Sequence, residues 1–143
     1  MMIKKFLILI CSIMLIFSTI SVSNAELIKV YDSSFRETSV IEESIESKEV
    51  GRYYQATIII HPKHGDKDKY HNGNMVLEIR RIMAFDPVNP KFKDLFIEYI
   101  TTFDKVIIKK YKNFHTISYL PANDMENYSI WKFVTFKGKE RRR

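Results

Sequence analysis

The sequence predicts an α+β fold: an antiparallel sheet of about four to five strands, with one or two helices packed on one face. Two observations lead to this prediction. Segments rich in isoleucine and aromatic residues alternate with segments whose apolar residues recur at helical spacing. Four glycines and four prolines are few for 143 residues, and no repeat or linker divides residues 26–136. We therefore expect those residues to form a single domain.

Residues 1–25 have the three-part order of a secretory signal peptide. Two lysines precede an apolar run over residues 6–17, and small polar residues follow it. Ser23 and Ala25 have the small side chains that signal peptidase requires three and one residues before the cut. An uncleaved anchor needs about 20 apolar residues, and three serines interrupt that length here. We expect cleavage after Ala25 and a periplasmic or secreted bacterial protein.

Cysteine content and charge narrow the class of protein further. Cys11 is the only cysteine, so loss of residues 1–25 would leave 118 residues without one. Such an exported protein depends on packing and not on disulfides for its stability. The formal net charge is +6, to which residues 137–143 contribute +4 and residues 26–136 nothing. We expect a basic, solvated C-terminal tail at 137–143 and no nucleic-acid partner.

The first half of the domain is expected to contain a helix and two strands. Residues 39–50 set three apolar side chains among glutamates, which favours a short surface helix. Residues 52–62 (RYYQATIIIHP) predict a strand that is buried on both faces and ended by Pro62. Residues 74–85 fit both a helical face and a strand face. We favour a strand there, paired with residues 53–61, because a lone sheet edge needs a partner.

The second half is expected to contain the main helix and three strands. In residues 89–103, Asn89 can cap a helix, Pro90 suits its first position, and apolar residues, most of them aromatic, recur at spacings of three and one. Residues 105–120 read as a hairpin that turns at Lys112 and Asn113. Residues 129–136 (SIWKFVTF) divide into two alternating sets that both contain bulky side chains, which predicts a last strand with bulk on both faces.

Three of the four histidines lie in one charged segment, HPKHGDKDKYH. His61, His64 and His71, with two aspartates between them, are residue types that bind zinc, copper or nickel. Three lysines would stand beside the cation, and a proline and a glycine break the spacing. We favour a solvated loop without metal. A metal-binding protein or metal-dependent hydrolase is the alternative.

Catalytic motifs are absent from the sequence. The mature chain has no cysteine, and no Gly-x-Ser-x-Gly turn, phosphate-binding glycine loop or dinucleotide fingerprint occurs. We therefore expect no enzyme activity, no catalytic residues and no cofactor.

Elimination and aromatic content favour a non-catalytic protein-binding or accessory protein of the bacterial envelope, with a protein partner there or outside the cell. Rigid amphipathic side chains often anchor interfaces. The candidates are Tyr53, Tyr54, Tyr119, Tyr128 and Trp131. A third alternative is weak binding to anionic lipid through the basic tail, by Lys137, Lys139, Arg141, Arg142 and Arg143.

Overall fold

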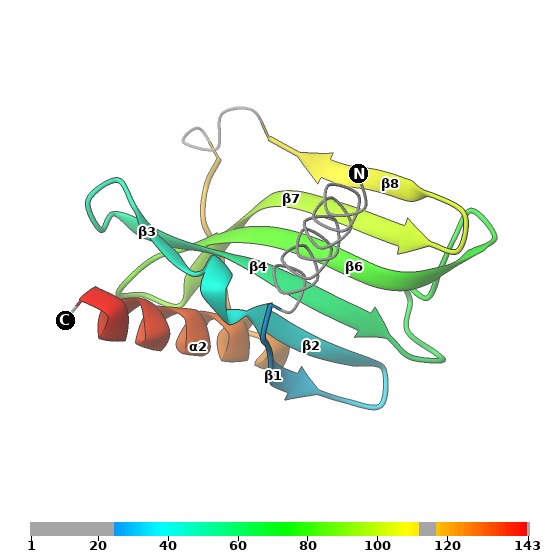
Figure 1. The fold of residues 1–143 in the computed structure, drawn as a ribbon, viewed down its shortest axis with the longest axis horizontal. Helices are drawn as coiled ribbons and strands as arrows, with labels where there is room; N and C mark the ends of the chain where they lie inside the picture. The colour runs from blue at the N-terminus through cyan, green and yellow to red at the C-terminus, as the bar shows by residue number, and fades with distance from the viewer. Residues whose placement is uncertain (1–24, 112–116, 143) are drawn as a thin grey trace, which may run out of the picture.

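The computed structural model describes residues 25–111 and 117–142 (Figure 1). Their main feature is a nine-stranded antiparallel sheet, with one α-helix at the C-terminal end of the described chain. The elements are β1 (Leu27–Asp32), β2 (Arg36–Ile41), the 3-10 helix η1 (Glu42–Ser44), β3 (Glu46–Lys48), β4 (Tyr53–Pro62), β5 (Tyr70–His71), β6 (Asn74–Phe85), β7 (Lys91–Thr101), β8 (Lys105–Lys110), β9 (Leu120–Pro121) and α2 (Met125–Arg142).

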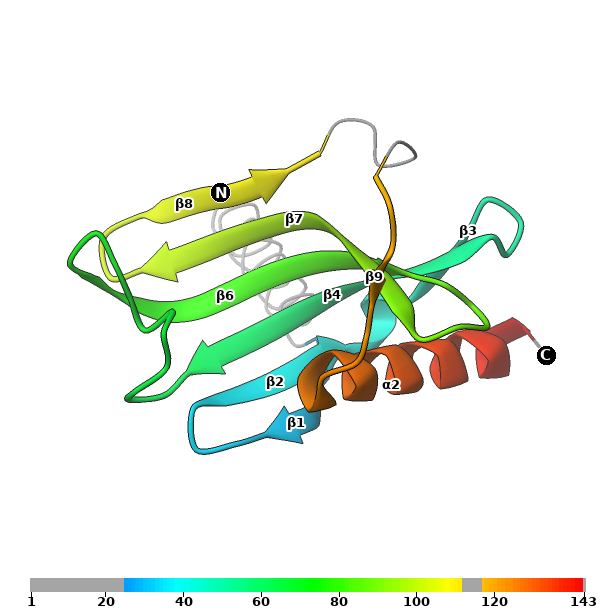
Figure 2. The ribbon, with the colours of Figure 1, turned by 180° about the vertical axis from the view of Figure 1, so that it is seen from behind.

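The sheet dominates this fold, so the predicted α+β class with about four to five strands is wrong. The strands follow the order β1-β2-β4-β6-β7-β8, with β3 beside β4, β5 beside β6 and β9 beside β7. Figure 2 shows α2 lying across the half of the sheet that contains β1, β2 and β4. The class changed because two segments that we expected as helices are mainly strands, and one expected strand is α2.

β4 is the centre of the sheet, and its prediction is confirmed. Ile58, Ile59 and Ile60 are buried on both faces, and the strand ends at Pro62. The preference for a strand at residues 74–85 is also confirmed, because β6 pairs antiparallel with β4 from Tyr54↔Phe85 to Ile60↔Ile79. The β-branched and aromatic run thus gave β4 correctly, and the need of that strand for a partner gave β6.

The helix predicted over residues 89–103 is wrong, because this segment is β7. Phe96 pairs with Ile82 and Asp94 pairs with Met83, so Leu95 is an extra residue in β7. Such a bulge breaks the period-two alternation of a strand. The apolar spacing that results resembles a helical stripe, which explains the error.

The strand predicted at residues 129–136 is wrong as well, because α2 contains this segment. Ile130, Val134 and Gly138 recur every four residues and are buried against the sheet. The start of α2 is fixed by Asp124, whose Oδ1 accepts a hydrogen bond of 2.8 Å from the backbone N–H of Asn127. This is the geometry of an N-cap.

The surface helix predicted over residues 39–50 is also wrong. Ser39 and Val40 belong to β2 and are buried opposite Ile59 and Ile58, and only η1 is helical in this stretch. Pairing with β4 overrides the weak apolar stripe of the segment.

The predicted hairpin at residues 105–120 is correct only in its first strand, β8. Its expected turn lies in residues 112–116, outside the described residues. β9 pairs with the first residues of β7 and not with β8. The expected signal peptide also lies outside the description, apart from Ala25. Among the helices that are described, none is long and apolar enough to span a membrane.

Candidate binding surface between the first strand and the helix

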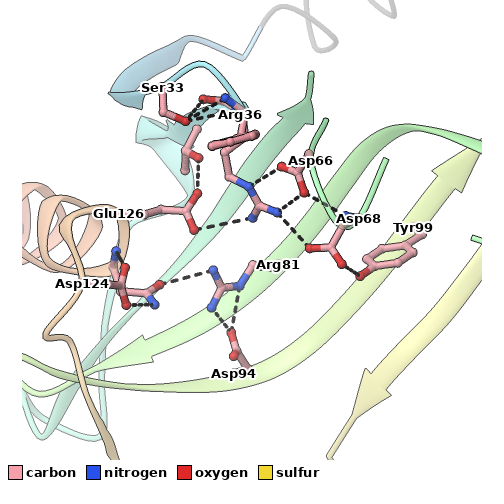
Figure 3. Close-up of polar contacts among 12 residues, drawn as sticks. Ser33, Arg36, Asp66, Asp68, Arg81, Asp94, Tyr99, Asp124 and Glu126 are labelled. Carbon is pink, nitrogen blue, oxygen red and sulfur yellow. Dashed lines mark hydrogen bonds and ion pairs between the residues drawn. The ribbon is translucent and has the colours of Figure 1, made fainter. Parts of the chain in front are cut away.

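A cavity of about 520 Å³ opens where three segments meet. Residues from 31–36, at the end of β1 and the turn into β2, line one side. Residues 65–67, in the loop after β4, and residues from 124–127, at the start of α2, complete it. We call this cavity the hollow. Figure 3 shows the polar side chains that hold these segments together.

Arg36 is the centre of this polar network. Arg36, Thr38 and Val40 alternate along β2 and share the face that α2 covers. The Arg36 Nε donates to Asp66 Oδ2 at 2.6 Å, and Nη2 donates to Asp66 Oδ1 at 2.7 Å. Nη2 also donates to Asp68 Oδ2 at 2.8 Å (Figure 3). The two-pronged contact with Asp66 is the strongest form of arginine–carboxylate pairing.

Burial makes this pair sensitive to the loss of either partner. The side chains of Arg36 and Asp66 are 15% and 2% exposed. Burial by itself raises the pKa of the Asp66 carboxyl, but the hydrogen bonds from Arg36 and from the N–H of Asp68 outweigh it and lower that pKa below its ordinary value. Burial opposes the charge on Arg36 too, and its bonds to Asp66 and Asp68 raise the pKa of the guanidinium. Both groups therefore stay ionised at neutral pH.

The helix joins the network through Glu126. Its Oε2 accepts a hydrogen bond of 2.7 Å from the Thr38 hydroxyl, and its Oε1 lies 3.6 Å from Arg36 Nη1. The adjacent Asn127 accepts from Arg81 Nη1 at 3.3 Å, and Arg81 donates twice to Asp94 Oδ1, at 3.0 and 2.8 Å. Two arginines on the sheet thus tie down the first turn of α2.

Tyr99 extends the network to β7. Its hydroxyl donates to Asp68 Oδ1 at 3.0 Å. Burial, with the Asp68 charge and this hydrogen bond, raises the pKa of Tyr99 to about 12. The ring of His71 meets the ring of Tyr99 edge to face at a centroid distance of 5.4 Å.

The ionised groups around Arg36 have partners within the protein. In the described part of the chain, no buried side-chain nitrogen or oxygen lacks a hydrogen bond. A catalytic acid or base needs access to a substrate proton, and the inner carboxylates of the hollow, Asp66 and Glu126, are already occupied by Arg36 and Thr38. The network therefore suits a structural role, which is to fix the shape of the hollow.

Phe35 lies at the mouth of the hollow on a rigid turn. It is 55% exposed. The Ser33 Oγ accepts hydrogen bonds from the N–H groups of Phe35 and Arg36 at 3.1 and 3.2 Å, and the Phe35 carbonyl accepts from the N–H of Lys63 at 2.7 Å. Lys63 Nζ also bonds Asp32 at 2.6 Å and the Ser33 carbonyl at 2.8 Å. An exposed aromatic ring is thus held on a fixed backbone.

The five aromatic residues suggested by the sequence do not form one surface. Tyr53 and Tyr54 are 7% and 1% exposed and belong to the interior. Trp131 is half-buried, and its Nε1 donates to the Asp86 carbonyl at 2.8 Å. The exposed Tyr128 lies beside it, with ring centroids 5.8 Å apart. Tyr119 is half-buried, and the Nζ of Lys93 lies 4.3 Å from the centre of its ring.

The three histidines of the charged segment have different surroundings. His61 lies 3.6 Å from Glu78, His64 is exposed, and His71 lies against Tyr99. Within residues 25–111 and 117–142, no group of three histidine, cysteine, aspartate or glutamate residues could hold a metal ion. Asp66 and Asp68, which the metal hypothesis grouped with these histidines, bind Arg36 instead.

The expected basic tail is the end of α2, at least as far as Arg142. Arg141 donates to the carbonyls of Ile45 and Glu42 at 2.9 Å each, and Lys137 lies 3.6 Å from the Glu42 carboxylate. Lys139 is exposed, whereas Arg143 and the side chain of Arg142 lie outside the description. α2 therefore continues past residue 136, where we expected the domain to end and the tail to begin.

Comparison with known proteins gives no identification: no family model, no curated protein and no solved structure matches the chain.

Sequence reasoning missed Phe35, Arg36 and Glu126. One signal was present, because Arg36 alternates with Thr38 and Val40 on a strand. A charged residue in phase with the buried positions of a strand requires a buried partner of opposite charge. Asp66 and Asp68 were noticed, but the sequence associated them with histidines and not with an arginine 30 residues earlier.

Proposed function

We propose that this chain is an exported, non-catalytic protein of the bacterial envelope that binds a protein partner at the hollow. Phe35 carries the proposal. Burying a large exposed ring contributes strongly to association, and binding energy is not spent on ordering a turn that is already fixed.

The hollow also suits protein binding better than catalysis. Its ionic groups are engaged with one another, which leaves its rim to provide contact area. The half-buried Tyr31 and the exposed Lys67 and Asp124 belong to this rim together with Phe35. An aromatic anchor surrounded by polar rim groups is the usual anatomy of a binding surface.

Affinity capture from the envelope fraction of the native host tests the proposal. We expect the wild-type protein to retain one stoichiometric partner and Phe35→Ser to lose it. Phe103→Ser is the matched control, because Phe103 is 85% exposed but lies in the turn between β7 and β8. If Phe35→Ser retains as much partner as the wild-type protein and Phe103→Ser do, and its thermal unfolding is unchanged, the hollow is excluded as the binding site.

The export part of the proposal rests on residues 1–25 and has its own test. N-terminal sequencing of the protein recovered from the periplasm or the medium should begin at Glu26. Full-length protein in the cytosol, free of membranes, contradicts export.

A further inference from the structure

A second cavity lies between β1 and α2, beside the residues of these two elements that line the hollow. Its volume is about 430 Å³, and its lining residues are Lys29, Val30, Ser129, Lys132, Phe133 and Phe136. We call it the groove. Tyr31, the next residue of β1, lines the hollow, and so do Glu126 and Asn127, which come before Ser129 in α2. The two cavities therefore follow each other between β1 and α2.

A bulge in β1 shapes this junction. Lys29 pairs with Ser39 and Tyr31 pairs with Thr38, so Val30 is an extra residue in the strand. Bulges redirect side chains: Val30 packs against the core and lines the groove, while Tyr31 lines the hollow. β1 is an outer strand of the sheet. Because a bulge disfavours addition of a further strand at such an edge, recognition here should depend on side chains.

The floor of the groove is apolar. Val30 and Phe133 are half-buried and pack against the core. Phe136, one turn further along α2, is 62% exposed. Two phenylalanines beside a valine form a pocket for an apolar side chain of a partner.

The charge of the groove is positive. Its lining includes two lysines and no acidic residue. Lys29 lies 3.6 Å from Asp32, and that carboxylate is held more closely by Lys63, at 2.6 Å. No ion pair joins Lys132 to an acidic residue of the described segments. The positive charges of these two lysines are thus little neutralised by carboxylates of the described chain, and both can contact an anionic ligand.

We propose that the groove takes an acidic and apolar segment of a protein partner; this inference rests on the function proposed for the hollow. Apolar side chains of the segment pack on Phe133 and Phe136, and its carboxylates lie beside Lys29 and Lys132. The hollow next to it brings Asp66, Asp124 and Glu126 together with Arg36 and Lys67. The acidic part of the partner should therefore bind at the groove and not at the hollow.

Fluorescence anisotropy with the full-length protein tests the charge preference. The probe is an end-blocked, labelled peptide with a leucine–phenylalanine pair flanked by glutamates, and the matched peptide has lysines in place of the glutamates. We expect the glutamate peptide to bind at least about tenfold more tightly, with the preference decreasing at high salt. In the double variant Lys29→Glu, Lys132→Glu, the preference should reverse.

Phe136→Ser tests the apolar contact and should weaken binding of the glutamate peptide about tenfold, whereas Phe103→Ser should not change it. Binding of neither peptide, equal binding of both, or no reversal in the double variant overturns the inference. Binding to vesicles of anionic phospholipid that the double variant loses, without any peptide preference, would identify a lipid surface instead and also overturn it. If capture of the native partner depends on Phe35 but not on Phe136, the groove is excluded and the proposed function stands.

Discussion

Arg36 shows how one charged residue can organise a binding surface. It lies on the buried side of β2 and holds the loop after β4 through Asp66 and Asp68, while Glu126 brings the start of α2 to it. A buried ion pair is poor evidence of stability by itself, but removal of one partner leaves the other charge uncompensated. Arg36 is therefore best understood as a residue that fixes one geometry.

Arg36→Met should lower the free energy of unfolding by about 3 to 5 kcal/mol at neutral pH, because Asp66 is left buried without its cation. The pKa of Asp66 is lowered in the folded protein. Its contribution to stability is therefore present above the ordinary aspartate pKa of about 3.9 and is lost as the pH falls through the folded-state value. Arg36→Met removes the main cause of the lowered Asp66 pKa. The difference in free energy of unfolding between the wild-type protein and the variant should therefore become smaller at acidic pH.

Urea unfolding between neutral and acidic pH measures this effect. Arg80→Met is the control, because Arg80 is an exposed arginine of the same sheet whose distance to Glu78 is 3.5 Å. We expect a change within about 0.5 kcal/mol for that control. A loss of stability for Arg36→Met that is the same at all pH values would show that packing, and not the ion pair, is responsible.

At the scale of the element, the contact between α2 and β4 depends on one glycine. A Cβ at Gly138 would lie 2.6 Å from the Tyr54 ring. Helix propensity alone predicts that alanine in place of a mid-helix glycine stabilises by about 1 kcal/mol. Tyr54 is fully buried and cannot move aside, so the steric effect should dominate.

Gly138→Ala should therefore destabilise the protein by about 1 to 2 kcal/mol, measured by thermal or urea unfolding. The same substitution in a Tyr54→Leu background should cost much less, since the ring that causes the clash is gone. Lys132→Ala, an exposed change in the same helix, is the control for helix propensity. An increase in stability for Gly138→Ala would show that α2 packs further from β4.

At the scale of the whole molecule, the C-terminal end of α2 connects to a segment nearly 100 residues earlier. The two hydrogen bonds from Arg141 reach residues 96 and 99 positions before it. Residues 137–142 thus form part of the fold that holds η1 in place. Their positive charge led us to expect a solvated tail, but helix geometry points Arg141 at η1.

Deletion of residues 137–143 should lower the free energy of unfolding by about 1 to 3 kcal/mol, because both charged hydrogen bonds are lost together. Lys139→Ala should change it by no more than about 0.5 kcal/mol, since Lys139 is exposed. Differential scanning calorimetry of both variants measures these changes in stability. An unchanged transition after the deletion would contradict a structural role for these residues.

The sequence by itself determined β4 and one edge strand, β8, because runs of β-branched and aromatic residues leave few alternatives. It favoured β6 over a helix only because β4 needs a partner strand. Residues 1–25 also led us to expect export, an expectation that the described residues 25–111 and 117–142 do not test. Only the tertiary structure showed that β7 is a strand and that residues 129–136 are helical. In β7 a bulge produced an apolar spacing like that of a helix. In α2 the alternation of side chains over residues 129–136 hid the four-residue spacing of the buried positions.

The binding surface was decided almost wholly by tertiary structure. Arg36, Asp66 and Glu126 are separated by 30 and 60 positions in the chain and meet only because β2, the loop after β4 and α2 pack at one corner. Sequence patterns reveal periodicity within one element, whereas Arg36 and Asp66 lie in different segments and follow no common spacing. The physical reason is that burial selects such partners by their charge and distance in space, whatever their separation along the chain.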